Sequence, residues 1–346
     1  MAHFFNSISD FKAVVGGATN VSLDLQSIAP TIEMVLEEHI IPYLSQDQFD
    51  ALYTAWQNDT LSLSQEALLP YVQKPLALLS LAEYASIGDV MLSDSGMHRK
   101  ELDEEGLKTA YKYQKNSYVD YMLKNGWNKV EKMLLFLEDN LSDYPLWDNS
   151  PEAASHRAFF LRYAQEFKEH YLRNFNRHTF EIIRPIIEEV ELLAILPLLG
   201  KPQYEELKST ASAEQLKLIP FLQKAMVHLI MHIAIRRTWI QVSAGKVVQT
   251  ERLEPQSAEK QGVASNVAVT QFLKEEKEFA NRQLSAVYQY LEDNIDSFPL
   301  YQAKLEAENM QAEEEENYPS NHRDHGASFS PRYDQFGNKR RGIKAI

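Results

Sequence analysis

Two histidines in the second half of the chain have the type and spacing of metal ligands. His228 and His232 stand four residues apart in the string VHLIMHIA, so a helix would place both imidazole rings on one face. The zinc-protease pattern requires a glutamate directly after the first histidine, whereas this chain has Leu229 there. Packing, or a hydrogen bond to a neighbouring helix, is the other role open to the pair. We therefore expect neither a metal nor any other cofactor, and keep His228 and His232 as the candidates for a metal site.

No other pattern in the sequence points to catalysis. The chain has no cysteine, which excludes disulfides, thiolate metal sites and a cysteine nucleophile. It also lacks the glycine-rich phosphate-binding motifs and the nucleophile motif of hydrolases. Acidic pairs recur at residues 138–139 and 292–293, but both stand at predicted helix ends, where solvation or an interface role is expected rather than acid–base catalysis. The sequence predicts a protein that is not an enzyme.

The chain is strongly acidic. Its 346 residues include 49 acidic and 35 basic side chains, which give a formal net charge of −14. Phosphate binding requires basic surface, so this charge argues against a protein whose whole surface grips nucleic acid, and favours one that DNA passes without sequence-specific binding. Lysines do alternate with aromatic residues between positions 111 and 127. Such a stretch could stack on single-stranded nucleic acid, or it could pack its aromatics and expose its lysines.

Apolar runs are too short to span a membrane. The longest are residues 192–199 and, broken by two histidines, residues 225–235, whereas a spanning helix needs about 20 apolar residues. The N-terminal string MAHFFNSISDFKAVVGG has neither the basic region nor the apolar region of a signal peptide. We expect no membrane partner and a soluble protein that is made inside the cell.

The clearest feature of the sequence is an internal repeat. Residues 137–147 read LEDNLSDYPLW and residues 291–301 read LEDNIDSFPLY, with six of eleven positions identical at an offset of 154. IAPTIEMV at residue 28 matches IRPIIEEV at residue 183, and LLPYVQK at residue 68 matches LIPFLQK at residue 218. Matches that keep their order while the offset drifts are typical of duplicated domains with small insertions in their loops.

The repeat divides the chain into three parts. The sequence predicts a first helical domain over residues 1–150, a second over residues 151–301, and a polar, flexible C-terminal tail over residues 302–346. The tail begins with acidic residues that could instead extend the last helix, and it ends with basic ones. It also holds several large apolar side chains, so it is either inert or a segment that becomes ordered on docking to a partner.

Apolar spacing predicts that both copies are helical bundles. Apolar residues recur every three or four positions through residues 130–141 and again through residues 284–295. Pro42 and Pro197 are expected to end the preceding helix at equivalent places. Further expectations are a capping box of Ser45 with Gln48, a kinked or interrupted helix around Pro70 and Pro75, and a first helix that is longer in copy two (157–174) than in copy one (7–15).

Each copy also has an extended segment between its two long helices. Residues 89–99 and 238–248 each place a glycine, Gly96 or Gly245, between two short extended runs, which is typical of a β-hairpin. An isolated hairpin is marginally stable in water, so each either leans on the bundle, pairs with a neighbouring subunit, or is an ordinary connector. The predicted fold class is mainly α, a tandem duplication of a helical bundle with a hairpin in each copy.

The stretch from residue 93 to residue 140 resembles a known family. It runs SDSGMHRKE, then KTAYKYQ, then a long helix that ends in LLFLEDN. This order is similar to an all-helical family of Bacteroidetes phages and prophages, which looks like the head–tail connector (adaptor, or head-completion) proteins of tailed phages. The second copy matches more loosely, since QVSAGKVVQTER and VAVTQFLKEEKEF replace the first two strings.

The resemblance implies a structural virion protein, assembled in the bacterial host cytoplasm, that forms a ring between portal and tail. It implies a homo-oligomer whose other partners are the portal and tail or further connector proteins, with the hairpins and the terminal segment as docking elements. Aromatic, apolar and arginine side chains usually anchor interfaces. The expected contact residues are Met97, Arg99, Trp239 and Val247 in the hairpins, and Phe336, Arg340 and Arg341 in the tail.

Two other functions stay open on the sequence alone. One is a helical scaffolding or interaction adaptor of bacterial origin that uses the tail as a peptide ligand. The other is a helical metalloenzyme that uses His228 and His232.

Overall fold

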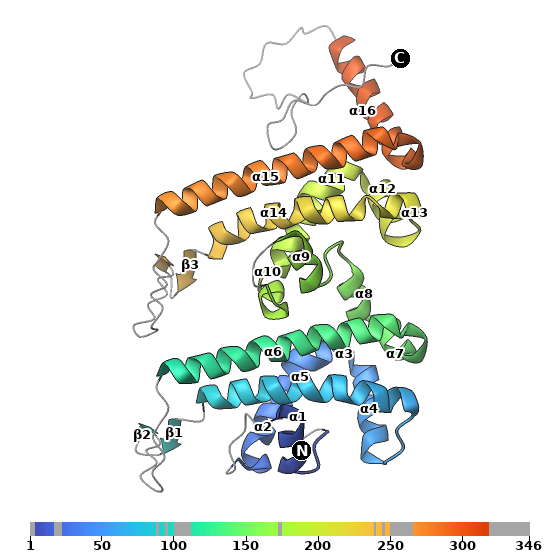
Figure 1. Ribbon diagram of the computed structural model, residues 1–346. Coiled ribbons are helices and arrows are strands. Elements are labelled where there is room, and N and C mark those ends of the chain that lie inside the picture. Colours follow the sequence, from blue (N-terminus) through green and yellow to red (C-terminus); the bar gives the residue numbers. More distant parts are fainter. Residues whose placement is uncertain are drawn as a thin grey trace.

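The protein is mainly α-helical. The structure, a computed structural model, describes residues 4–16, 23–87, 90–93, 96–99, 112–171, 175–238, 240–243, 246–249 and 266–317. Figure 1 shows two similar groups of helices stacked one above the other, each with a pair of long helices and a short strand pair at the same end. The first group belongs to copy one of the sequence repeat and the second to copy two.

Copy one contains seven α-helices among the residues described. Its elements are α1 (Ile8–Val15), α2 (Leu25–Val35), a π-helical turn η1 (Leu36–Ile40), α3 (Ile41–Leu44), α4 (Gln46–Gln57), α5 (Leu63–Ile87), β1 (Val90–Ser93), β2 (Gly96–Arg99), α6 (Lys112–Asp139), a 3₁₀ turn η2 (Leu141–Asp143) and α7 (Pro145–Asp148).

Copy two follows a similar order, with an additional short helix near its start and another, α13, before its first long helix. Its elements are α8 (Pro151–Arg157), α9 (Ala164–His170), α10 (Arg177–Val190), a π-helical turn η3 (Glu191–Ile195), α11 (Leu196–Leu199), α12 (Lys201–Ser209), α13 (Ala213–Leu216), α14 (Ile219–Thr238), β3 (Ile240–Ser243), β4 (Lys246–Gln249), α15 (Asn266–Asp293), a 3₁₀ turn η4 (Ile295–Ser297) and α16 (Pro299–Asn317).

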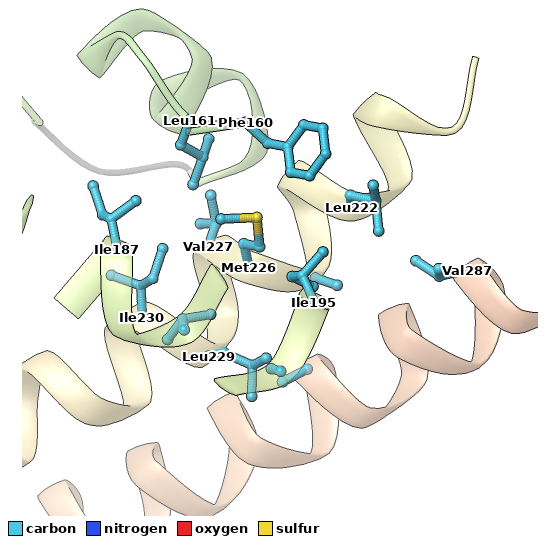
Figure 2. Close-up of a cluster of buried hydrophobic side chains, with 14 of the residues drawn as sticks. Phe160, Leu161, Ile187, Ile195, Leu222, Met226, Val227, Leu229, Ile230 and Val287 are labelled. Atoms are coloured by element: carbon cyan, nitrogen blue, oxygen red, sulfur yellow. The ribbon is translucent and has the colours of Figure 1, made fainter. Parts of the chain in front are cut away.

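Each copy has its own hydrophobic core. The first is formed by side chains between Phe4 and Ala153, and the second by side chains between Phe160 and Tyr301. Figure 2 shows part of the second core, in which Met226 and Ile230 of α14 lie among apolar side chains from neighbouring elements. Burial of apolar side chains on one face of each helix is the main force that holds the bundle together.

The same hydrogen bonds recur at equivalent positions of the two copies. The side-chain amide of Gln73 donates to the Phe4 carbonyl over 2.8 Å, and that of Gln223 donates to the Phe160 carbonyl over 2.8 Å. Reciprocal caps also recur, at Ser62 with Gln65 and at Ser212 with Gln215. Because these bonds are not required by helix formation itself, they show that the two copies share one tertiary packing arrangement.

Pro42 and Pro197 widen a helix instead of ending it, contrary to the expectation from sequence. Proline has no N–H, and its ring displaces the carbonyl four residues earlier. The residue before each proline therefore donates five residues back, from Ile41 to Leu36 and from Leu196 to Glu191, which makes a π-helical turn. The helix then continues for one further turn and ends at a residue with positive φ, Ser45 in copy one and Gly200 in copy two.

Three other expectations about the helices need correction. Pro70 and Pro75 lie within α5 but do not interrupt it. The first helix of copy two is not a long helix over 157–174, since α8 and α9 have seven residues each and are separated by residues without helical structure. The tail predicted from residue 302 begins later, because α16 continues to Asn317. Half of the predicted capping box is present, with the Ser45 hydroxyl accepting from the Gln48 N–H over 3.4 Å, whereas the Ser45 N–H donates to the Ile41 carbonyl rather than to Gln48.

One helical stretch among the residues described, Ala213–Arg237, is long and apolar enough to cross a membrane by length and composition alone. Half of that stretch is buried inside the protein. Its apolar side chains include Leu222, Met226 and Ile230, which lie in the second core. Burial at the centre of a bundle accounts for this composition, since a helix that is covered on most sides is apolar around most of its surface.

Gly126 lets α6 approach α5, and a side chain at this position will destabilise the fold. A Cβ atom on Gly126 would lie 2.6 Å from Cδ2 of Leu79, whose side chain is fully buried. We expect Gly126→Val to lower the free energy of unfolding by roughly 1–3 kcal/mol through overpacking, measured by urea titration. Asn128→Val on the same helix is the control and should cost less than about 1 kcal/mol. Equal losses in the two variants would contradict this close approach.

Candidate functional site

The predicted interaction elements lie at one end of the long helices. β1 pairs with β2 in antiparallel register from Val90 with Arg99 to Ser93 with Gly96, and β3 pairs with β4 in the same way. Among the residues described, each sheet contains only these two strands. Both strand pairs lie at the same end of the stack, beyond α5 and α14 (Figure 1). The two copies therefore place equivalent short strand pairs at the same end of their long helices (Figure 1).

The structure gives positions to some of the predicted contact residues. Met97 and Arg99 lie in β2, and Val247 lies in β4. Trp239 of the second hairpin and the tail residues Phe336, Arg340 and Arg341 lie outside the described residues. The backbone thus brings the hairpin residues to one edge of the fold.

The two candidate metal ligands are each bonded to α15 through one ring nitrogen. Nδ1 of His228 lies 2.8 Å from a carboxylate oxygen of Glu276, and Nδ1 of His232 lies 2.9 Å from the Leu273 carbonyl. The other Glu276 oxygen accepts from the Tyr171 hydroxyl over 3.0 Å. Among the described residues no group of three or more histidine and carboxylate side chains could hold a metal. The two histidines tether α14 to α15, which is the hydrogen-bonding role considered for the pair, and Tyr171, directly after α9, binds the same carboxylate.

The junction between the two copies contains a buried carboxylate that crosses from one copy to the other. Glu131 of α6 is 7% exposed. Its two oxygens accept from the backbone N–H groups of Ala164 and Gln165, over 3.2 and 3.0 Å. These are the first residues of α9, where N–H groups have no partner inside the helix. Copy one thus caps a helix of copy two, and the helix dipole adds a favourable interaction with the negative charge.

Aromatic and arginine side chains extend this junction. The Trp127 ring of α6 stacks on His178 of α10 at 5.6 Å between centroids. Arg157 of α8 binds Glu138 of α6 over 2.8 Å. The guanidinium of Arg177 in α10 lies 5.5 Å from the ring of Tyr43. Because stacking, an ion pair and a cation–π contact all cross the same boundary, the two copies are held in one orientation.

A cavity lies within the junction. Its volume is about 240 Å³, and it is lined by side chains of both copies: Pro42, Tyr43, Leu134, Pro151, Glu152, Ser155, His156 and Arg184. His156 is 6% exposed, and its Nε2 atom has no hydrogen-bond partner. Burial lowers the pKa of His156 to about 2, and nearby arginines, first Arg177, add to the shift. A neutral imidazole with this pKa cannot supply a proton at ordinary pH, so the cavity has no evident acid–base chemistry.

Copy two has a buried polar network that sequence reasoning did not predict. Glu191 is fully buried in η3, and its carboxylate accepts from the Phe160 N–H over 2.8 Å, from the Tyr204 hydroxyl over 2.6 Å and from Lys208. Burial lowers the pKa of Lys208, while Glu191 opposes that shift. This network explains why α8 and α9 are two short helices instead of one long helix. The Phe160 N–H, which lies between them, donates to the Glu191 side chain rather than to a helical carbonyl.

The signal for this network was present in the repeat alignment. At the 155-residue offset, Glu191 and Tyr204 correspond to Leu36 and Phe49, which belong to the apolar core of copy one. An acid that replaces leucine within an apolar run needs a buried partner. Glu131 and Arg177 gave no comparable signal, since their partners are remote in sequence.

The comparisons with known proteins identify one family. The profile of a family of unknown function (DUF6712) matches the chain twice, over residues 40–157 and 195–309. The two matched segments correspond to the two copies of the helical domain and confirm the tandem organisation. No curated protein and no solved structure matches the chain.

The carboxylate at the junction will contribute measurably to stability. We expect Glu131→Ala to lower the free energy of unfolding by about 1–2 kcal/mol, because it leaves two N–H groups of α9 without their cap. Ser285 stands at the equivalent position of α15, is exposed and bonds only within its own helix. Ser285→Ala is therefore the control and should change stability by less than about 0.5 kcal/mol. Urea unfolding of both variants checks this, and a Glu131→Ala effect no larger than the control would contradict the capping role.

The buried imidazole of His156 predicts acid sensitivity. In the unfolded chain His156 binds a proton near its ordinary pKa of 6.5, whereas in the folded protein it does so only near 2. The contribution to stability is therefore complete above pH 6.5 and is lost as the pH falls towards 2. We expect the free energy of unfolding of His156→Leu to fall less steeply than that of the wild type between pH 6.5 and 5, by up to about 1.4 kcal/mol per pH unit.

Urea titrations at several pH values provide this measurement. The free energy of unfolding of each protein is expressed relative to its own value at pH 8. The packing cost of the substitution, which does not depend on pH, then cancels. Parallel pH profiles for the two proteins would show that His156 titrates normally in the folded state.

Proposed function

We propose that this chain, which belongs to the DUF6712 family, is a structural and non-catalytic virion protein that acts as a ring-forming connector. In this proposal it assembles in the bacterial host cytoplasm and joins the portal to the tail of a phage particle. The observation that carries the proposal is the repetition of one strand pair, at one edge, in two copies of a rigid helical scaffold (Figure 1).

The strand pairs support an interaction role because they lack a sheet of their own. Each contains two strands of four residues, paired only with each other in the described part of the chain. A two-stranded hairpin of this kind is marginally stable in water, and its outer edges present unpaired N–H and C=O groups. Pairing with a neighbouring subunit would satisfy these groups, and Met97, Arg99, Trp239 and Val247 are the proposed contact residues.

The junction supports the proposal in a second way. A ring requires that each subunit present its contact surfaces at a fixed angle, since a variable angle gives open aggregates. Glu131, Trp127 and Arg157 hold the two copies in one orientation, as described above. The net charge of −14 also suits a channel that DNA passes without binding.

The C-terminal segment is the second proposed contact region. Residues 318–346 follow α16 in the sequence and carry four basic residues near their end, at positions 339–341 and 344. Phe336, Arg340 and Arg341 are the proposed anchors in this segment. Genes for portal, capsid and tail proteins beside the gene of this chain would support the whole proposal.

Replacement of a hairpin will separate folding from assembly. We expect a variant with residues 90–99 replaced by a glycine–serine linker to keep its helical circular dichroism, since β1 and β2 pair with no strand but each other in the described part of the chain. The same variant should assemble more weakly than the wild type in analytical ultracentrifugation, because one of the two strand pairs that would pair with a neighbour has been removed. The control carries alanine at the exposed Lys201–Glu205 ion pair and should assemble as the wild type does.

Two outcomes would overturn the proposal. One is a hairpin variant that assembles normally. The other is a wild-type chain that is monomeric at all concentrations and does not bind purified portal protein.

A further inference from the structure

Three lysines of copy one form a basic surface along the seam between α5 and α6. Lys74 and Lys132 are exposed, and Lys129 between them is partly buried. None of the three makes an ion pair with another described residue. Burial lowers the pKa of Lys129, and the positive charges of Lys132 and Lys74 lower it further. This surface therefore gains from any anionic partner.

An aromatic pair adjoins these lysines. The rings of Tyr71 and Phe136 are stacked with 4.2 Å between centroids, and Tyr71 is 37% exposed. Tyr71 precedes Lys74 by three residues on α5, and Phe136 follows Lys132 by four on α6, so the aromatic and basic side chains share one face. The surface thus combines an apolar anchor with positive charge, and we call it the Lys74 surface (Tyr71, Lys74, Lys129, Lys132 and Phe136).

The opposite chemistry is found in α16. From Leu305 to Asn317 this helix carries six glutamates and no basic residue. Its first turns pack on α12 and η4, but Met310 is 64% exposed. Four consecutive glutamates, at residues 313–316, stand at the C-terminus of the helix, where negative charge opposes the helix dipole. This end of α16 therefore gains from a cationic partner.

The Lys74 surface occurs once in the chain. The repeat alignment places Gln283 and Ala286 at the positions of Lys129 and Lys132, so copy two keeps only Lys224 of the three lysines. There is one Lys74 surface and one acidic α16 in each chain. Figure 1 shows α16 at the far side of copy two from copy one. A contact between the two therefore joins different chains in a one-to-one ratio.

We propose that α16 of one chain docks on the Lys74 surface of a second copy, with its glutamates beside the lysines and Met310 against the Tyr71–Phe136 pair. The inference rests on the proposed ring function and specifies one of its interfaces. The contact joins two different surfaces, head to tail, which produces a closed ring when the rotation closes and a filament when it does not. It also relieves the like-charge repulsion on both sides, and methionine is well suited to an aromatic partner.

Charge reversal in the full chain tests this contact. We expect Lys74→Glu with Lys132→Glu to raise the dissociation constant of the assembly at least about tenfold, since attraction becomes repulsion, measured by analytical ultracentrifugation. Glu313→Lys with Glu314→Lys should weaken assembly similarly, and the chain with all four substitutions should regain it. Lys224→Glu, which changes the copy-two counterpart of Lys74, is the matched control and should assemble normally. Circular dichroism shows whether each variant is folded.

The outcomes separate this inference from the function on which it rests. Rescue by the fourfold variant supports the docking, because a folding defect would not be repaired by charges on another helix. Unchanged assembly of the lysine variant overturns the docking and leaves the ring function in place. A wild-type chain that is monomeric overturns both. Binding of a single-stranded DNA oligonucleotide that is lost in the lysine variant, with assembly unchanged, would assign the surface to nucleic acid instead.

Discussion

The outer face of α6 is the surface on which the arrangement of the two copies depends. One side of this helix packs against α5 within copy one, and a neighbouring side packs against copy two. Trp127, Glu131 and Leu134 follow one another at helical spacing on that second side, and all are buried. Two of them contact copy two directly, through a stacked ring and a helix cap. The linker between the two copies would by itself allow them many relative orientations. The contacts made by this face of α6 fix one of these orientations.

The equivalent face of α15 has a different composition. Asn281, Ser285 and Tyr288 replace the three buried residues of α6, and none of them is fully buried. The two copies have therefore diverged on the outer face of their last long helix.

The hydrophobic cores of the two copies also differ in composition. At the positions of His228 and Glu276 in copy two, copy one carries Leu78 and Met122. Together with the Glu191 network, these exchanges give copy two a set of buried polar groups that need specific partners. An apolar core tolerates several packings, whereas a buried hydrogen-bond network permits few. The core of copy two is thus compatible with fewer side-chain packings than the core of copy one.

The sequence predicted the features that depend on neighbouring residues. The long helices, the strand pairs between them and the two-copy organisation follow from apolar spacing, glycine positions and the LEDN repeat, all of which are local or periodic signals. The π-helical turns were missed because proline was expected to end a helix rather than widen it. The break between α8 and α9 was missed because Phe160 bonds to Glu191, 31 residues away.

The candidate site was only partly predictable for the same reason. The hairpin residues could be named because a hairpin is recognised locally. The junction residues could not, since Glu131 and Arg177 look like ordinary charged helix residues until the partner copy is in place. The basic surface on α5 and α6 was equally hidden, because Lys74 and Lys132 are 58 positions apart and meet only through helix packing.

Cryo-electron microscopy of the purified full-length chain, at micromolar concentration and low ionic strength, tests the central claim most directly. Closed rings of uniform subunit number, with the hairpin edge and α16 at subunit boundaries, are the predicted result. Isolated particles of a single chain under these conditions, and after addition of portal protein, would contradict a ring-forming connector.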